Sequence, residues 1–233
     1  MSTIFNFIKK LLLVFMIYTA ISLIIIIFFR FIDISYSSFM NSASEFPDGL
    51  ITNEIDFKFV SIDKMSSALP LAVIASEDQA FFEHFGFDFN QIEKALKENK
   101  RRKRIRGAST ITMQVAKNLF LSPSKNFLRK GIESYYTLLL EVLWGKKRIL
   151  EVYLNIAEMG KNTFGVGAAS KKYFNKEPAR INFSQAALIA SVLPKPSVRN
   201  LNRPSGYMIR RKSEIIRQMN QLGGNNFIKE NLY

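Results

Sequence analysis

The sequence has 233 residues and is 48% hydrophobic, which suits one domain with a real core beside a membrane span. Its formal net charge of +14 favours acidic partners, namely phosphates, anionic lipid headgroups or nucleic acid. The absence of cysteine excludes disulfides, thiolate catalysis and zinc–thiolate sites, and any Ser-His-Asp triad would depend on the single histidine, His84.

The first predicted element is an apolar helix, because Leu11 to Phe29 carries no charged residue. A stretch of about 20 apolar residues is long enough to cross a bilayer. A cleaved signal peptide is the alternative, but its apolar region is shorter and precedes a small-residue cleavage site, whereas this stretch ends in Ile-Phe-Phe-Arg-Phe. The sequence therefore predicts a retained transmembrane helix over residues 11–30.

The flanking charges predict the orientation of this helix. Lys9 and Lys10 precede it, whereas Arg30 and Asp33 follow it. Positive residues concentrate on the cytoplasmic side, so residues 1–10 are predicted to be cytoplasmic and the rest of the chain to lie outside. That topology excludes nucleic acid as a partner.

Residues 31–53 are rich in serine, contain the turn signal Pro47-Asp48-Gly49, and are predicted to form a stalk. Residues 54–233 then form one domain. Ile55 to Ile62 alternates weakly and predicts one short extended segment. Because almost everything after it has helical patterning, the predicted fold class is mainly α.

Capping signals locate the helices of this domain. Pro70 suits the first turn of a helix that runs to about Ala80, and Asp88 with Gln91 resembles a capping box for a helix ending near Lys100. The further predicted helices are Thr110–Leu119 capped by Ser109, Phe127–Trp144, Lys147–Ile156, Val166–Phe174, Ser184–Leu193, and Ser205–Leu222 ending at Gly223-Gly224. The apolar face predicted for Phe127–Trp144 consists of Leu128, Ile132, Tyr135, Leu139 and Val142.

Acidic residues and the histidine lie among aromatic rings in the segment from Ser76 to Gly86. A carboxylate beside apolar surface has its charged form disfavoured, which raises its pKa toward general acid–base use. The carboxylates of this segment are those of Glu77, Asp78 and Glu83. A solvated turn with a structural histidine is the alternative interpretation.

Two further segments could bind phosphate. Gly107-Ala108-Ser109-Thr110 precedes a predicted helix whose N–H groups and dipole favour anions, and Lys117 lies two turns further on; the same residues also make an ordinary N-cap. Arg129 and Glu133 share a helix face, with Lys130 beside them, either as a surface ion pair or as an acid that holds cations near a phosphate. The basic run Lys97 to Arg106 is either a solvated loop or an attraction to anionic lipid.

Taken in order, these segments resemble the motifs of the glycosyltransferase family 51 peptidoglycan polymerases, and among them the monofunctional biosynthetic transglycosylases of Gram-negative bacteria. The resemblance covers about Leu69 to Gly224 and rests on five ordered motifs. These are Glu-Asp-x-x-Phe-x-x-His-x-Gly at Glu77 to Gly86, Gly-x-Ser-Thr-Ile-Thr-x-Gln at Gly107 to Gln114, Arg-Lys-x-x-Glu at Arg129 to Glu133, Lys-x-x-Ile-Leu-x-x-Tyr-Leu-Asn at Lys146 to Asn155, and Arg-x-x-x-Ile-Ile-x-x-Met at Arg211 to Met219.

Two positions depart from the family pattern. Met113 replaces the first of two glutamines, which predicts a missing polar contact to substrate. Lys125 stands where relatives often have arginine, so its charge is kept but bidentate phosphate geometry is lost.

The resemblance implies a lysozyme-like helical fold and the polymerisation of lipid II into β-1,4 glycan with release of undecaprenyl pyrophosphate. It implies Glu77 as the general base, and Glu133 as a catalytic residue that either positions cations or helps to hold a divalent cation, Mg²⁺ or Mn²⁺, on the pyrophosphate; no cofactor is otherwise expected. The substrate-binding residues that it implies are Ser109, Thr110, Gln114, Lys117, Lys125, Arg129 and Lys130.

The implied partners are lipid II, the growing glycan and the bilayer of the inner membrane, with the catalytic domain in the periplasm. Proteins of cell division or cell-wall synthesis stay open as further partners. Two other functions also stay open: a lysozyme-like hydrolase or lytic transglycosylase, and a non-catalytic anchored scaffold. The former has no need of the cations, and the latter has no need of Glu77 and Glu133.

Overall fold

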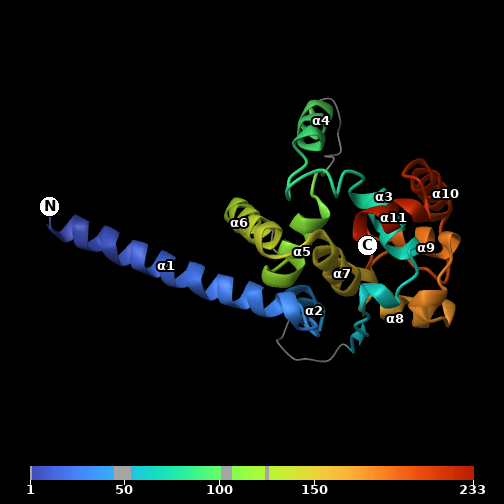
Figure 1. Ribbon diagram of the computed structural model, residues 1–233, viewed down its shortest axis with the longest axis horizontal. Helices are drawn as coiled ribbons and strands as arrows, with labels where there is room; N and C mark the ends of the chain where they lie inside the picture. Colours follow the sequence, from blue (N-terminus) through green and yellow to red (C-terminus); the bar gives the residue numbers. More distant parts are fainter. Residues whose placement is uncertain (1, 45–53, 101–106, 124–125) are drawn as a thin grey trace.

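The computed structural model describes residues 2–44, 54–100, 107–123 and 126–233. Helices make up most of these residues, so the prediction of a mainly α protein is confirmed. In Figure 1 one long helix, α1 (Ser2–Phe31), extends away from the other helices, which gather into a single body. The basic run at 101–106 and the second part of the predicted stalk, 45–53, lie outside the described residues.

Helix α1 begins earlier than the predicted span, because the residues before Leu11 continue the same helix. Ile4–Phe31 is long and apolar enough to cross a membrane, and it is the one such helix in the described parts of the chain. Its second half packs against the domain: Trp144 Nε1 donates to the carbonyl oxygen of Ile26 at 2.8 Å, and Arg148 Nη2 donates to that of Phe29 at 2.8 Å. Helix α1 is therefore joined to the domain by hydrogen bonds as well as by the connecting chain.

Helix α3 (Ala68–Glu77) forms the centre of the domain, and all of its residues from Ala68 to Ala75 are buried. It ends three residues before the predicted Ala80, so Glu77 is its last residue. The helices that pack against it are α7 (Lys146–Ile156), α9 (Phe183–Ala190), α10 (Gly206–Gln221) and α11 (Asn225–Leu232). A helix that is buried on every side fixes the position of the residue at its end.

A small sheet in the order β1-β3-β2 lies beside α8 (Gly165–Phe174) and consists of β1 (Asp56–Phe57), β2 (Glu158–Gly160) and β3 (Thr163–Phe164). The predicted extended segment at Ile55 to Ile62 forms a strand only over β1, and its end begins the 3-10 helix Ile62–Lys64. Asn155 holds the chain between them: its side chain accepts from Val60 N at 2.8 Å and donates to Val60 O at 2.9 Å. The asparagine of the fourth motif therefore supports the fold.

Helices α4 (Phe89–Asn99) and α5 (Ile111–Phe120) begin at side-chain caps. Asp88 accepts from Gln91 N, as predicted. The cap of α5 is Thr110, whose Oγ1 accepts from Met113 N at 3.2 Å, so the prediction that Ser109 caps this helix is wrong. A shift of one residue leaves Ser109 outside the helix, where its side chain is exposed.

The buried face of α6 (Phe127–Leu143) differs from the prediction. Leu128 and Val142 are 77% and 66% exposed, whereas the buried side chains are Glu133, Thr137, Leu140 and Glu141. The apolar pattern was misleading because α6 buries ion pairs and hydrogen bonds toward the domain. Leu128 and Val142 are thereby left on the surface of α6, the helix that packs against α1.

Two short helices were not predicted. Helix α2 (Ser38–Ser44) lies inside the predicted stalk and packs against α5, and α11 closes the chain after Gly223 and Gly224. Both glycines have positive φ, 101° and 63°, which ends α10 at the predicted point and turns the chain into α11.

Candidate active site

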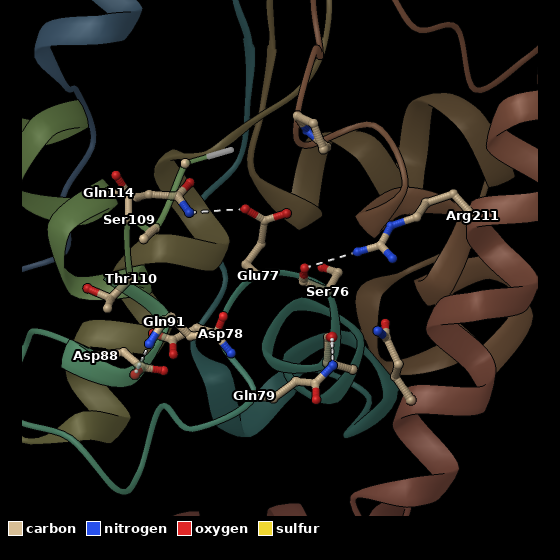
Figure 2. A pocket seen from close by; sticks show the side chains of 15 residues that line it. Ser76, Glu77, Asp78, Gln79, Asp88, Gln91, Ser109, Thr110, Gln114 and Arg211 are labelled. Atoms are coloured by element: carbon tan, nitrogen blue, oxygen red, sulfur yellow. Dashed lines mark hydrogen bonds between the residues drawn. The ribbon is translucent and has the colours of Figure 1, made fainter. Parts of the chain in front are cut away.

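Glu77 lies at the end of α3 with its carboxylate facing a cavity (Figure 2). Gln114 Nε2, from α5, donates to Glu77 Oε2 at 3.0 Å. Burial raises the pKa of Glu77, because the charged form loses solvation, while the hydrogen bond from Gln114 lowers it by a smaller amount. The carboxyl group therefore combines a raised pKa with access to a ligand-sized space, as a general acid or base requires.

Gln114 is itself held in one orientation. The hydroxyl of Tyr153, a buried residue of α7, donates to Gln114 Oε1 at 3.1 Å. Because the amide oxygen accepts from Tyr153, the amide nitrogen is the atom that faces Glu77, and it can only donate. Three helices, α3, α5 and α7, thus contribute to the position of one carboxylate.

The turn after Glu77 is fastened to the start of α5. Asp78 Oδ1 lies 2.9 Å from His84 Nε2, and Asp78 Oδ2 accepts from Ile111 N at 2.9 Å. Thr110 Oγ1 donates to the carbonyl oxygen of Gly86 at 2.6 Å. Gly86 has a φ of 78°, and a Cβ there would lie 2.8 Å from the Thr137 side chain, so glycine is required. Asp78 and His84 therefore support the turn that follows Glu77.

The cavity has a volume of about 800 Å³ and lies between the end of α3, the start of α5 and α10. Four of the predicted site residues line it together: Glu77, Ser109, Thr110 and Gln114. The other lining residues are Ala75, Ser76, Asp78, Gln79, Asp88, Gln91, Gly107, Ala108, Pro194, Arg211 and Gln218. Hydrogen-bond donors and acceptors therefore surround Glu77, and both are needed to bind the hydroxyl groups of a carbohydrate.

The second predicted group lies on α6. Glu133 is only 2% exposed, and its two oxygens accept from Arg129 Nη1 at 3.1 Å and from Lys130 Nζ at 2.5 Å. The alternative of a surface ion pair is therefore wrong for Glu133. One buried carboxylate holds two cations in place, and none of the three residues lines the cavity.

Lys117 connects the two groups. It lies on α5, and burial lowers its pKa, while the charges of Glu133 and Glu77 both raise it and those of Arg129 and Lys130 lower it. Its ammonium therefore lies within electrostatic reach of Glu77 and of the α6 cluster, the name used here for Glu133, Arg129 and Lys130. Lys125, the remaining predicted cation, lies outside the described residues.

The residues that the structure describes form no metal site with protein ligands, because they contain no group of three or more acidic or histidine side chains that could hold a metal ion. Glu133, the one carboxylate predicted to help to hold a divalent cation, already accepts from a cation at each oxygen.

The sequence reasoning assigned no role to Arg211 and Tyr153, which the structure brings to the site. Both lie inside recognised motifs, so the signal was present, but nothing local placed them beside Glu77. Met113 is 4% exposed and does not line the cavity. The glutamine that lines the cavity, Gln114, is present. The loss of a polar substrate contact at Met113 stays a prediction.

Comparison with known proteins agrees with this geometry. A family model described as "Transglycosylase" matches residues 47–220. Relatives named "Biosynthetic peptidoglycan transglycosylase" match most of the chain, and three of them are compared here. The protein of Pasteurella multocida is 46% identical over 220 residues, 94% of this chain and 89% of the relative. The protein of Citrobacter koseri is 54% identical over 183 residues, which are 76% of this chain and 76% of the relative. The protein of Haemophilus influenzae is 47% identical over 202 residues, which are 85% of this chain and 82% of the relative.

The matched segment contains all five motifs and every residue of the site described above. The family resemblance seen in the motifs is thereby confirmed, and with it the assignment as an enzyme. This chain belongs to the transglycosylase family, in the group of the biosynthetic peptidoglycan transglycosylases.

Proposed function

We propose that the protein polymerises lipid II into β-1,4-linked glycan strands and releases undecaprenyl pyrophosphate, as a step of cell wall biogenesis. The observation that carries the proposal is the position of Glu77, a half-buried carboxylate that lines a cavity of about 800 Å³ and lies within electrostatic reach of Lys117. A base beside a fixed cation suits attack on a sugar that leaves a diphosphate.

Glu77 acts as the general base in a single displacement. The 4-hydroxyl of the acceptor GlcNAc gives its proton to Glu77 as its oxygen forms a bond to the anomeric carbon of the donor MurNAc. The bond from that carbon to the diphosphate oxygen breaks, and its electron pair leaves with the diphosphate. An α-linked donor thereby becomes a β-linked product. General-base assistance of this kind typically contributes about 10²–10⁴-fold to the rate.

Cations stabilise the diphosphate as it takes up negative charge. Lys117 and Arg129 carry this role, with Lys130 and Lys125 in support, because fixed charges in a partly dry site need no reorganisation. Glu133 positions Arg129 and Lys130, each of which it binds directly. Ser109, Thr110 and Gln114 line the path of the sugar and phosphate groups.

The anchor places enzyme and substrate on the same surface. Both substrates carry polyprenyl tails, so a domain tethered by α1 meets them at the outer leaflet of the inner membrane, with the N-terminus in the cytoplasm and the domain in the periplasm. The hydrogen bonds from Trp144 and Arg148 to α1 support a fixed height of the cavity above the bilayer.

Purified full-length protein with labelled lipid II tests the proposal against its two rivals. We expect polymer to form from lipid II alone. Shortening of preformed glycan without polymerisation would instead identify a hydrolase or lytic transglycosylase. Binding of lipid II with no turnover would identify a scaffold.

The pH dependence of polymerisation follows from the raised pKa of Glu77. A protonated Glu77 cannot accept the hydroxyl proton, so kcat/KM should fall as the pH falls through the pKa of this group. Because burial raises that pKa, the acidic limb should lie above the value of about 4.3 for an ordinary glutamate. Initial rates across the pH range measure the limb, and lipid II binding over the same range is the control. A limb at or below 4.3 would remove Glu77 from the role of base.

A further inference from the structure

We propose that Arg211 is a positioning residue for Glu77: from α10 it fixes the end of α3 and supplies a positive charge beside the base. This inference rests on the proposed role of Glu77. Arg211 contacts neither the α6 cluster nor any residue of α5 in the described hydrogen bonds, so it acts on the carboxylate from the opposite wall of the cavity. Figure 2 shows Glu77 between Gln114 on one side and Arg211 on the other.

The end of α3 depends on this contact. The last carbonyl groups of a helix lack partners within it and need donors from elsewhere. Here Ile74 O accepts from Asp78 N at 2.9 Å, and Ala75 O accepts from Gln79 Nε2 at 3.1 Å. Ser76 O accepts from Arg211 Nη2 at 3.1 Å. Arg211 thereby reaches across 135 residues of sequence and binds the peptide unit that precedes Glu77.

Arg211 is well placed to hold that position. Its side chain is 21% exposed, and Nη1 pairs with Glu214 Oε2 at 3.2 Å on the same helix. Among the residues that the structure describes, it is the one lysine or arginine that lines the cavity. A cation at the C-terminal end of a helix also interacts favourably with the helix dipole. Position and charge therefore both direct this guanidinium toward the end of α3.

The charge of Arg211 favours the ionised form of Glu77. Burial raises the pKa of Glu77 and Asp78 raises it further, whereas the bond from Gln114, the charge of Arg211 and then that of Lys117 lower it. Burial raises the pKa of Tyr153, on α7, and the charge of Glu77 raises it further. His84 bonds to Asp78 and not to Glu77. Arg211 is thus the charge that most favours ionised Glu77 among these neighbours.

The Arg211→Gln variant separates positioning of the base from simple bracing of the fold. Loss of the positive charge should raise the pKa of Glu77, so more of the base is protonated at a given pH. The acidic limb of kcat/KM should therefore move to higher pH, and the loss of rate should be larger at low pH than at high pH. A loss that is uniform across pH, with an unmoved limb, overturns the proposal.

Arg210→Gln is the matched control, because Arg210 is the exposed neighbour of Arg211 and carries the same charge. Its limb should coincide with that of the unmodified protein; an equal shift in both variants overturns the proposal, since net charge alone would explain it. If Arg211→Gln does not fold, the variant Glu214→Gln tests the proposal in its place. It removes the exposed carboxylate that pairs with Arg211, so the limb should move to lower pH, and an unmoved limb there overturns the proposal.

The same assays keep this inference apart from the proposed function. Polymerisation that persists in Glu77→Gln rejects Glu77 as the base and Arg211 with it. An inactive Glu77→Gln together with an unmoved limb in Arg211→Gln rejects only the role of Arg211.

Discussion

Glu77→Gln is expected to lower the rate of polymerisation by about 10²–10⁴-fold, the usual contribution of a general base. Glutamine has the shape of glutamate and can still accept from Gln114 Nε2, but it cannot take up the acceptor proton. Burial raises the pKa of Glu77, so ionised Glu77 destabilises the folded state relative to a neutral group at neutral pH. The variant should therefore keep or raise its melting temperature and still bind lipid II.

Glu83→Gln is the control for this experiment. Glu83 lies in the same segment and its side chain is exposed, so the variant removes one carboxylate without touching the cavity. Its rate should match that of the unmodified protein. A Glu77→Gln protein with a near-normal rate would show that another group accepts the proton.

Lys146→Met is expected to lower the free energy of unfolding by about 3–5 kcal/mol, the cost of leaving a buried charge without its partner. Lys146 Nζ donates to Glu141 Oε1 at 2.8 Å and to the carbonyl oxygen of His84 at 2.7 Å. The Glu141 side chain is 3% exposed, and Thr112 Oγ1 donates to the same oxygen at 2.6 Å. Losing Lys146 therefore weakens the link between α6, α5 and the turn after Glu77. Denaturant unfolding in detergent measures the change.

Lys147→Met is the matched control, because the next residue pairs with Asp63 on the surface. The two side chains are 40% and 55% exposed, and such pairs contribute about 0–1 kcal/mol. Similar losses from Lys146→Met and Lys147→Met would mean that the Glu141 pair is no stronger than a surface pair. A Glu141→Met, Lys146→Met double variant should recover part of the loss, since no buried charge then remains.

Features that depend on neighbouring residues were predicted from the sequence. Asp88 caps α4 because its side chain needs only the N–H of Gln91, three residues away. Gly223 and Gly224 end α10 because glycine adopts positive φ without a steric penalty. The apolar run of α1 was likewise readable from a few residues, since it depends on local composition. Glu77 was singled out only by the resemblance of its motif to a family.

Features that depend on distant contacts were missed or mistaken. The apolar pattern of α6 predicted the wrong buried face, because Glu133 and Glu141 are buried by their cationic partners and not by their own hydrophobicity. Helix α11 and the pairing of β1 with β3 bring together segments that carry no local signal for each other. In each case the stabilising contact is made with a residue or segment that the local sequence pattern cannot identify.

The sequence by itself determined the helical class, the long apolar helix at the N-terminus and the motifs that identify the family. Only the tertiary structure decided how these residues divide: Glu77, Ser109, Thr110 and Gln114 share a cavity, whereas the α6 cations cluster around Glu133 outside it. It also brought Arg211 to the end of α3. The reason is physical: a side chain's charge and shape are fixed by its type, but its burial, its hydrogen-bond partners and hence its pKa are fixed by the helices that pack around it.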